Sequence, residues 1–362
     1  MKYKINKNNA SPAYLQLYKQ LRDDIVAQIY PCGGKLPSKR VISEELGIST
    51  VTVEHAYALL ADEGYIESRQ RSGYFVIFST DQGFVSPPSD SARALKVGSF
   101  ERSPDFPFSV LAKTMRTVLS EYGEGMLDRS DGAGRAELRD AIRCYLARSR
   151  GIVATNSQII IGSGAEYLYS LIVELLGRDK VFAIESPSYQ KIELVYRAAD
   201  VSVEMLTLGS DGIDSSALRK SKADVLHITP YRSYPSGVTA SASKRHEYLR
   251  WAGEKARYIV EDDFESEFSV SKKSEETLFS HSPDDNIIYM NTFSQTVSPS
   301  FRVGYMVLPS HLVAEFEKKL GFYSCTVPTY IQLVLARLIT NGDFERHINR
   351  VRRKKRKQGE NK

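Results

Sequence analysis

Short apolar runs alternate with helix-like segments between residues 158 and 290. The expected strands are Gln158–Ile161, Val181–Ile184, Val203–Leu206, Val225–Thr229, Tyr258–Glu261 and Ile287–Met290. Alternation of this kind predicts an α/β domain with a mostly parallel sheet, because strands joined by helices run in the same direction. Ligands of such sheets bind beyond the carboxyl ends of the strands, so polar side chains at those ends are the first candidates for a site.

The composition fits a globular chain of two or three domains. At 362 residues, the chain is 42% hydrophobic and 26% charged, which is ordinary. No apolar run approaches the roughly 18 residues of a membrane span, and the first residues lack the apolar core of a signal peptide. Cys32, Cys144 and Cys325 are scattered and fit neither a disulfide framework nor a zinc site. We therefore expect a cytoplasmic protein with no metal site.

The net charge of +5 is concentrated near the end of the chain. Residues 346–362 hold nine Lys or Arg residues and one acidic residue, a local charge of +8, which leaves −3 for the other 345. Net charge is therefore no argument for nucleic-acid binding. The run Arg352–Lys357 could attract phosphates non-specifically, or it could be the solvated and frayed end of a helix.

Residues 1–78 predict three helices and a hairpin. The helices are expected over Tyr14–Ile29, Ser38–Leu46 and Thr50–Asp62, and the strands over Tyr65–Ser68 and Tyr74–Val76. The first helix would bury Leu15, Tyr18, Leu21, Ile25 and Ile29 along one face, and the third would bury Val53, Ala56, Tyr57 and Leu60. Ser38 is a typical N-cap, and Gly64 should end the third helix. This order of elements predicts a winged helix-turn-helix domain.

This segment resembles the DNA-binding domains of the GntR family. The matching residues are Leu36-Pro-Ser-Lys-Arg40, Leu46-Gly-Ile-Ser49, Thr52-Val53, Ala56-Tyr57, Glu63-Gly64-Tyr65 and Ser72-Gly73. The resemblance implies contacts to phosphates or base edges of duplex DNA from Ser38, Arg40, Ser49 and Thr52, and a wing near the minor groove shaped by Arg69, Arg71 and Gly73. Thr50 stands where the family usually has an arginine, so one DNA contact is lost. Alternatively, the three helices only pack against a neighbour and the arginines are solvated.

A polar connector is expected after this domain. Residues 79–101 contain Pro87-Pro88 and several Ser and Asp residues without clear periodicity, as is typical of a flexible or partly extended linker. We therefore predict a DNA-binding domain at 1–78, a linker at 79–101 and a second domain at 102–362.

One stretch after the last expected strand carries side chains suited to a phosphate. Residues 291–305 read NTFSQTVSPSFRVGY, with hydroxyl groups at Thr292 and Ser294, an arginine at Arg302 and a closing Gly304. Short donors and an arginine that can fork onto two oxygens are typical of a phosphate-binding loop.

This stretch resembles the lysine loop of the pyridoxal-phosphate enzymes of aminotransferase fold type I, in the MocR/GabR-like branch of the GntR family. There the loop reads T-F-S-K-x-x-x-P-x-x-R-x-G-Y, and the lysine forms a Schiff base with the cofactor. The lysine position is Gln295 in this chain, and an amide has no nucleophilic amine. The resemblance thus implies a vestigial cofactor site without its covalent anchor.

Other strand ends resemble the same fold. The resemblance implies that Ser163-Gly164-Ala165 presents backbone amides to the phosphate, and that Asp262 pairs with the pyridine nitrogen. Tyr189 follows a turn similar to the family's D-P-x-Y, residues 232–234 displace a polar residue near the ring, and Phe264 replaces a tyrosine whose hydroxyl contacts the cofactor. Taken singly, such a carboxylate is equally explained as a helix cap, and such an arginine as part of a surface ion pair.

The last residues resemble an internal segment of the family. Residues 341–350 are similar to its G-x-F-E-R-H-I-R-R-M-R segment, after which family members carry the rest of the small domain and the arginine that binds the substrate carboxylate. We therefore expect the C-terminal part of the small domain to be missing. Apolar surface around Phe106–Leu119 should then be exposed or covered by another chain.

Three functions remain open, and we expect the first. It is a homodimeric DNA-binding transcriptional regulator with a duplex operator, nucleoid-associated in bacteria, whose aminotransferase-like domain serves dimerisation and senses an effector that the sequence does not name. This regulator would not be an enzyme, and pyridoxal phosphate could bind it only weakly and non-covalently. The second is a pyridoxal-phosphate transaminase, which Gln295 and Phe264 argue against, because transamination needs the lysine as its base. The third is a degenerate fragment that regulates nothing.

Overall fold

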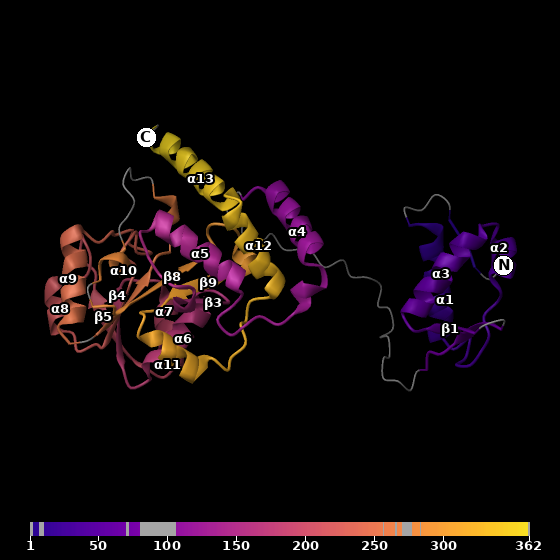
Figure 1. Ribbon diagram of the computed structural model, residues 1–362, viewed down its shortest axis with the longest axis horizontal. Helices are drawn as coiled ribbons and strands as arrows, with labels where there is room; N and C mark the ends of the chain where they lie inside the picture. The colour runs from indigo at the N-terminus through magenta and orange to yellow at the C-terminus, as the bar shows by residue number, and fades with distance from the viewer. Residues whose placement is uncertain are drawn as a thin grey trace. The chain divides into compact units, whose positions relative to one another are not determined.

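The computed structural model describes residues 3–6, 11–69, 72–79, 106–255, 257–264, 266–269, 277–282 and 284–360. The chain divides into two compact units, Met1–Gly98 and Ser99–Lys362, and each is described by itself (Figure 1). Apart from Ser79, the expected linker at 79–101 lies outside the described residues, and so does Arg71. Among the described residues, no helix is long and apolar enough to cross a membrane, and no group of His, Cys, Asp and Glu side chains could hold a metal ion.

The N-terminal unit is a three-helix bundle with a two-stranded wing, as predicted. Its elements are α1 (Ala13–Val26), α2 (Lys39–Leu46), α3 (Thr50–Asp62), β1 (Ile66–Arg69) and β2 (Gly73–Val76). The two strands pair antiparallel, with Ile66 opposite Val76. The predicted end of the first helix was wrong. Gln28 has a left-handed backbone with φ of 60°, which stops the helical turn, and Ile29 beyond it is 53% exposed instead of buried.

Capping residues fix the turn between α2 and α3. Ser38 Oγ accepts a hydrogen bond from the Val41 amide at 3.3 Å, and Ser49 Oγ accepts one from the Thr52 amide at 3.1 Å. These hydroxyls satisfy amides that have no partner within the helix. Gly47 ends α2 with φ of +61°, a conformation that glycine adopts without steric cost. The Tyr57 hydroxyl then donates to the Pro37 carbonyl at 2.7 Å, which ties α3 to the start of α2.

The large unit is built on a seven-stranded sheet in the order β3-β9-β8-β7-β6-β4-β5. The strands are β3 (Ile159–Gly162), β4 (Val181–Ser186), β5 (Ser202–Thr207), β6 (Val225–Ile228), β7 (Tyr258–Asp262), β8 (Ile287–Thr292) and β9 (Gly304–Val307). The pairings among β4 to β8 are parallel, whereas β9 runs antiparallel to β3 and β8. The mostly parallel sheet was predicted, but β9 was not, because its first residues were assigned to the preceding loop.

Helices cover both faces of this sheet and make three layers. They are α4 (Phe108–Tyr122), α5 (Ala136–Ser149), α6 (Ala165–Leu176), α7 (Gln190–Ala198), α8 (Ser215–Lys220), α9 (Ala242–Gly253), α10 (Leu278–His281), α11 (Leu312–Leu320), α12 (Thr329–Thr340) and α13 (Asp343–Glu360). Val260 and Ile288 belong to the core under α6, α7 and α11. Ile259 and Ile287, their neighbours along the strands, belong to the core under α8, α9 and α10. Alternate residues of each strand thus face opposite layers.

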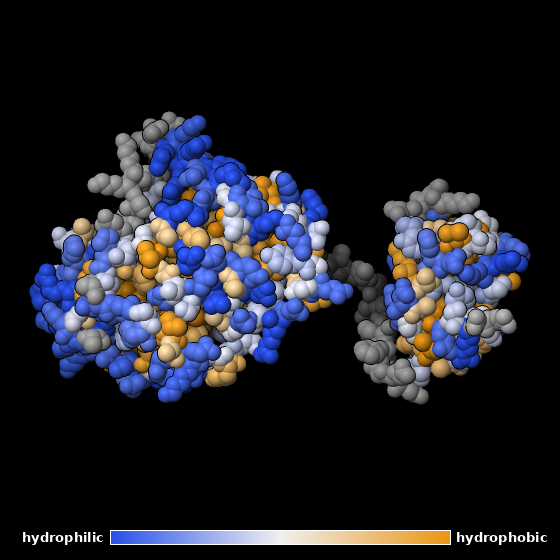
Figure 2. All heavy atoms as spheres, viewed as in Figure 1, coloured by the Kyte–Doolittle hydropathy of each residue, from blue (hydrophilic) through white to orange (hydrophobic). Residues whose placement is uncertain are grey.

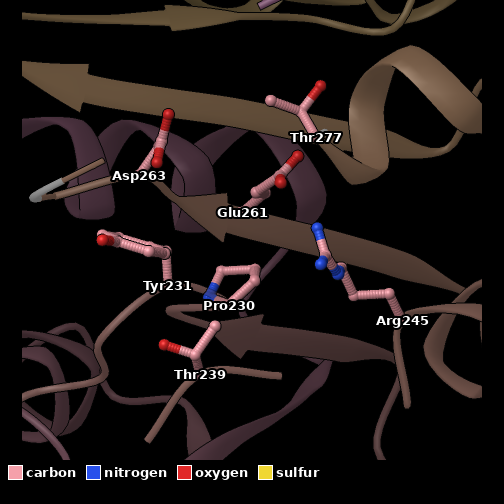
Figure 3. Close-up of a pocket in the computed structure, with 7 residues that line it drawn as sticks. All are labelled: Pro230, Tyr231, Thr239, Arg245, Glu261, Asp263 and Thr277. Atoms are coloured by element: carbon pink, nitrogen blue, oxygen red, sulfur yellow. The ribbon is translucent and has the colours of Figure 1, made fainter. Parts of the chain in front are cut away.

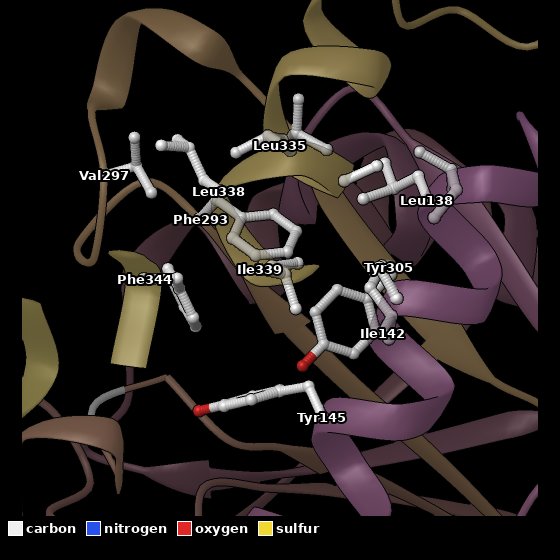
Figure 4. Packing of buried hydrophobic residues seen from close by; sticks show 14 of the residues in the cluster. Leu138, Ile142, Tyr145, Phe293, Val297, Tyr305, Leu335, Leu338, Ile339 and Phe344 are labelled. Carbon is white, nitrogen blue, oxygen red and sulfur yellow. The ribbon is translucent and has the colours of Figure 1, made fainter. Parts of the chain in front are cut away.

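A further core joins α4, α5, α12 and α13 to the β3–β9–β8 end of the sheet (Figure 4). The expected apolar surface on α4 is exposed in part. Phe108 and Leu119 are 78% and 48% exposed, whereas Val118 is fully buried in this core. The basic run Arg352–Lys357 lies within α13, and Figure 2 shows hydrophilic residues over that helix. The side chains of Arg353, Lys354 and Arg356 are exposed.

Candidate functional site

The predicted phosphate loop connects β8 to β9 and is anchored by two apolar side chains. Phe293 and Val297 are buried in the core shown in Figure 4, and the Val297 amide donates to the Phe293 carbonyl at 2.9 Å. Ser294 and Gln295, between these anchors, are half-buried. Thr292 and Gly304 pair across β8 and β9, so the loop begins and ends at the same place on the sheet. The loop is therefore held at both ends, and the side chains at 294 and 295 lie on its turn.

Arg302 is brought to the predicted glycine turn but is already paired there. Its Nη2 donates to Glu166 Oε2 at 2.7 Å, and Glu166 Oε1 accepts from Lys191 Nζ at 2.5 Å. Lys191 and then Arg302 lower the pKa of the Glu166 carboxyl below its usual value. Gly164 has φ of +96°, and a Cβ there would lie 3.7 Å from the Arg302 guanidinium. Gly164 and Arg302 thus lie close together, and Glu166 bridges Arg302 and Lys191.

Asp262 is buried at the end of β7 in a cluster of aromatic side chains. Its Oδ2 accepts a hydrogen bond from the Tyr169 hydroxyl at 2.6 Å. His227 Nε2 lies 3.6 Å from the same oxygen, and His227 Nδ1 is 2.6 Å from the Tyr196 hydroxyl. Burial, and then the charge of Asp262, raises the pKa of Tyr169 well above its usual value, so this hydroxyl keeps its proton and donates. Sequence reasoning did not identify these partners of Asp262.

Glu185 and Tyr189 lie at the end of β4. Glu185 is buried and accepts hydrogen bonds from Ser233 Oγ at 2.6 Å and from the Thr229 amide at 3.4 Å. Burial raises the pKa of Glu185 to about 7. Tyr189 is 39% exposed, and its ring meets that of Tyr234 edge to face, with 6.2 Å between centroids. Ser233, which stands in the segment where the family's polar residue is displaced, is therefore committed to Glu185.

The buried Glu185 predicts a pH-dependent stability. The folded pKa of Glu185, about 7, exceeds the ordinary glutamate value of 4.5. Its protonated carboxyl therefore stabilises the fold fully below about pH 4.5, and this contribution is lost as pH rises through 7. We expect the wild type to lose on the order of 3 kcal/mol of unfolding free energy across that window from this group. Glu185→Gln should remove that part of the slope in denaturant unfolding. Glu174→Gln, at an exposed position on α6, should keep the wild-type slope, and equal slopes in all three proteins would contradict the assignment.

A second buried ionic network lies at the ends of β7 and β8. Arg150 Nε is 2.9 Å from Asp263 Oδ2, and the Tyr289 hydroxyl donates to the same oxygen at 2.7 Å. Glu267 accepts from Asn291 Nδ2 at 2.6 Å, and burial raises the pKa of Glu267 to about 7. Asn291 in turn receives the amide of Thr292 on its Oδ1 at 2.6 Å. This network therefore supports the start of the β8–β9 loop from the side opposite to Asp262.

A small cavity lies near this network (Figure 3). It is lined by Pro230, Tyr231, Thr239, Arg245, Glu261, Asp263 and Thr277. Glu261 accepts the amides of Leu278 and Phe279 at 2.8 and 2.9 Å, and burial, with the nearby charge of Asp263, raises its pKa to about 8. At about 10 Å³ the space suits one water molecule. None of the predicted cofactor residues lines it.

In the N-terminal unit the predicted DNA contacts gather at the starts of α2 and α3 and on the wing. Ser38 and Ser49 cap their helices, and Ser49 Oγ lies 2.8 Å from Thr52 Oγ1. Arg40 and Thr50 are exposed. Sequence reasoning missed the exposed apolar side chains beside them, Val41 and Val51, at 44% and 56% exposure.

Of the two arginines predicted to shape the wing, Arg69 lies among the described residues. Arg69 Nε donates to Glu67 at 2.7 Å, and its guanidinium lies 4.5 Å from the centre of the Phe75 ring. Gly73 starts β2 with φ of +108°. Arg71 falls outside the described residues.

Comparison with known proteins connects these two units. Residues 13–76 match the family described as bacterial regulatory proteins, gntR family, and residues 105–360 match aminotransferase class I and II. The uncharacterized HTH-type transcriptional regulator YdeL of Bacillus subtilis is 32% identical over 98% of this chain and 79% of the relative. The chain belongs to the MocR-like branch of the GntR family.

Other relatives of this branch agree. The probable rhizopine catabolism regulatory protein MocR of Rhizobium meliloti is 27% identical over 94% of this chain and 74% of its own length. The pyridoxine biosynthesis regulator PdxR of Corynebacterium glutamicum is 26% identical over 96% of this chain and 78% of its own length.

Solved aminotransferases share the fold of the large unit. The kynurenine aminotransferase of Pyrococcus horikoshii, in complex with PMP, matches with a TM-score of 0.62 and 24% identity, over 68% of this chain and 64% of that one. The α-aminoadipate aminotransferase LysN of Thermus thermophilus, complexed with N-(5'-phosphopyridoxyl)-L-leucine, matches with a TM-score of 0.60 over 69% and 65%. The chain thus spans less than two thirds of each of these enzymes.

Two of the side chains predicted to bind pyridoxal phosphate already have partners within this chain. Arg302 donates to Glu166, and Asp262 Oδ2 already accepts from Tyr169. The amide of Gln295 cannot condense with an aldehyde. Arg302 and Asp262 are therefore both engaged within the protein.

Proposed function

We propose that this protein is a DNA-binding transcriptional regulator whose N-terminal unit contacts duplex DNA through α2, α3 and the wing. The observation that carries the proposal is the arrangement at the helix starts. Capped, amide-bearing helix N-termini lie beside the exposed Arg40 and Thr50, and helix N-termini with neighbouring arginines suit phosphate oxygens. Val41 and Val51 add exposed apolar surface of the kind that contacts thymine methyl groups.

The large unit is proposed to act as a dimerisation and ligand-sensing domain without catalysis. Gln295 offers no amine for covalent attachment and no base for proton transfer, so transamination is not expected. Pyridoxal phosphate would bind weakly and without a covalent bond, because the arginine and the aspartate that would hold it are engaged. A dimer of two chains would present two N-terminal DNA-binding units to paired half-sites of the operator. The protein would act on the bacterial nucleoid, where its operator lies.

The proposal is tested with the full-length chain and a pool of random duplex DNA from which bound sequences are selected. We expect a selected duplex to bind two chains, and the logarithm of the binding constant to fall linearly with the logarithm of salt concentration, because bound phosphates release counterions. Failure to enrich any duplex, with the protein folded by circular dichroism, would overturn the proposal.

Arg40→Ala should weaken binding to the selected duplex by about 1–3 kcal/mol, the effect of an arginine that reaches a base edge. Arg40 is exposed at the start of α2, so the substitution should not disturb the fold. Titration by fluorescence anisotropy measures the change. Arg178→Ala, an exposed arginine of the large unit paired with Glu174, serves as the control with unchanged affinity. An Arg40→Ala protein that binds as tightly as this control would remove Arg40 from the interface.

A further inference from the structure

One helix pairs with two of the side chains predicted to bind the cofactor, Arg302 and Asp262. Glu166 in the first turn of α6 bridges Arg302 and Lys191. Tyr169, one turn further along the helix, donates to Asp262. We propose that Glu166 and Tyr169 act as internal ligands that compete with phosphorylated pyridine ligands for Arg302 and Asp262, and that they set the affinity and selectivity of this site. The inference rests on the proposed ligand-sensing role of the large unit.

The competition at the phosphate end is electrostatic. Arg302, Lys191 and the N-terminus of α6 together favour an anion, and Glu166 supplies that anion. Glu166 is ionised when paired in this way, because both cations favour its carboxylate. A phosphate monoester carries about 1.5 to 2 negative charges at neutral pH. It would therefore meet a carboxylate of the same sign that is already bonded to Arg302 and Lys191.

The competition at the ring end is for one carboxylate oxygen. A protonated pyridine nitrogen would donate to Asp262, but Oδ2 of Asp262 already receives the Tyr169 hydroxyl. Tyr169 is 1% exposed and packs against His227 with 5.0 Å between ring centroids, so its hydroxyl is fixed in place. His227 Nε2, 3.6 Å from the same oxygen, further crowds the approach.

The two competitors act from the same helical face. Residues 166 and 169 are three apart and therefore neighbours on the surface of α6. Their targets come from different strands, since Asp262 ends β7 and Arg302 precedes β9. A ligand with a phosphate and a pyridine ring would compete with both side chains for these two groups. This arrangement predicts separate effects of Glu166 on the phosphate group and of Tyr169 on the ring.

The test uses two probes that lack an aldehyde, so reaction with any lysine is excluded. Pyridoxine 5'-phosphate carries the phosphate, and pyridoxine does not. Binding to the full-length chain is measured by equilibrium dialysis. Glu166→Gln should tighten pyridoxine 5'-phosphate about tenfold to a hundredfold, the effect of freeing one charge-assisted hydrogen bond. It should leave pyridoxine unchanged, whereas Tyr169→Phe should tighten both probes by similar factors.

The controls isolate the charge at position 166. Glu174→Gln, on the same helix and paired with Arg178, should bind both probes like the wild type. Lys191→Met in the Glu166→Gln background should reverse part of the gain for pyridoxine 5'-phosphate alone. Glu166→Ala replaces Glu166→Gln if the latter fails to fold by circular dichroism.

Three results would overturn the inference. They are an unchanged affinity in Glu166→Gln, an equal gain for both probes in that variant, and no measurable binding of either probe to any variant. Duplex DNA affinity is measured on the same samples. If the wild type binds no duplex DNA but the variants show the expected pattern with the two probes, the regulatory function is rejected and the competition by Glu166 and Tyr169 stands. The two failures are therefore distinguishable.

Discussion

Replacing Arg150 with methionine should lower the unfolding free energy of the large unit by about 3–5 kcal/mol, the usual result of removing one partner from a buried ion pair. Arg150 is 5% exposed and faces Asp263 and Glu267, which are also buried. Methionine fills much of the volume but leaves two carboxyl groups without their cation. Denaturant unfolding followed by the fluorescence of Trp251 measures the effect, since this residue is the single tryptophan of the chain and is buried in the large unit.

The loss of unfolding free energy should depend on pH and on the burial of the substituted arginine. Burial raises the folded pKa of Glu267 to about 7, above the ordinary glutamate value of 4.5, although Arg150 opposes the rise. Without Arg150 the Glu267 carboxyl binds a proton more readily, so Arg150→Met should be least destabilising at acidic pH, and its deficit relative to the wild type should grow as pH rises past about 7. Arg148→Met is the matched control, because Arg148 is an exposed arginine paired with Glu345 and should change stability by less than about 1 kcal/mol. Equal losses in both variants would contradict the role assigned to the network.

The architecture followed from local patterns that the structure keeps. The strand–helix alternation from residue 158 to residue 290 became β3 to β8 with their helices. Ser38 and Ser49 cap α2 and α3 because a serine before an amphipathic run satisfies local amides whatever the distant contacts are. The predicted end of α1 was wrong, and the reason is also local. The apolar spacing extends to Ile29, but the backbone of Gln28 turns out of the helix first.

The pairing of Arg302 with Glu166 and of Asp262 with Tyr169 could not be predicted from local patterns. Glu166 and Arg302 are separated by 136 residues, and Tyr169 and Asp262 by 93. Which side chains meet depends on strand order and on the rotation of α6, and neither is encoded in local spacing. The order β3-β9-β8-β7 brings the ends of β7 and β8 next to one another and places the antiparallel β9 between β8 and β3. Arg302 was expected to face an incoming phosphate beside Gly164, and its ion pair with Glu166 in the first turn of α6 was missed.

The signal that could have found the pairing is in the sequence. A glutamate directly after the Ser163-Gly164-Ala165 turn places a negative charge where the proposed phosphate would bind. Read together with the tyrosine three residues later, it predicts one helix face bearing an anion and a hydroxyl donor.

Gln295→Lys should convert the pocket to one that attaches pyridoxal phosphate covalently, with the largest yield when Glu166→Gln is also present. Position 295 lies on the turn between the buried anchors Phe293 and Val297, in the same loop as Ser294 and Arg302. A lysine amine there could condense with the aldehyde and release water, and borohydride would reduce the resulting carbon–nitrogen double bond to a stable amine. Mass spectrometry of the peptide that contains position 295 measures the yield.

The comparison among four proteins decides what remains of the pocket. The wild type should show no adduct on this peptide, and Gln28→Lys, an exposed glutamine of the N-terminal unit, reports the background at a surface lysine. Gln295→Lys should exceed that background, and adding Glu166→Gln should raise the yield further at limiting cofactor, because the phosphate then meets Arg302 and Lys191 without a competing carboxylate. An adduct of equal yield on other lysines of the wild type would show that the chemistry lies elsewhere. If the double variant forms no adduct, the residues at the strand ends do not hold pyridoxal phosphate within reach of a lysine at position 295. The large unit would then serve the regulator only as a scaffold.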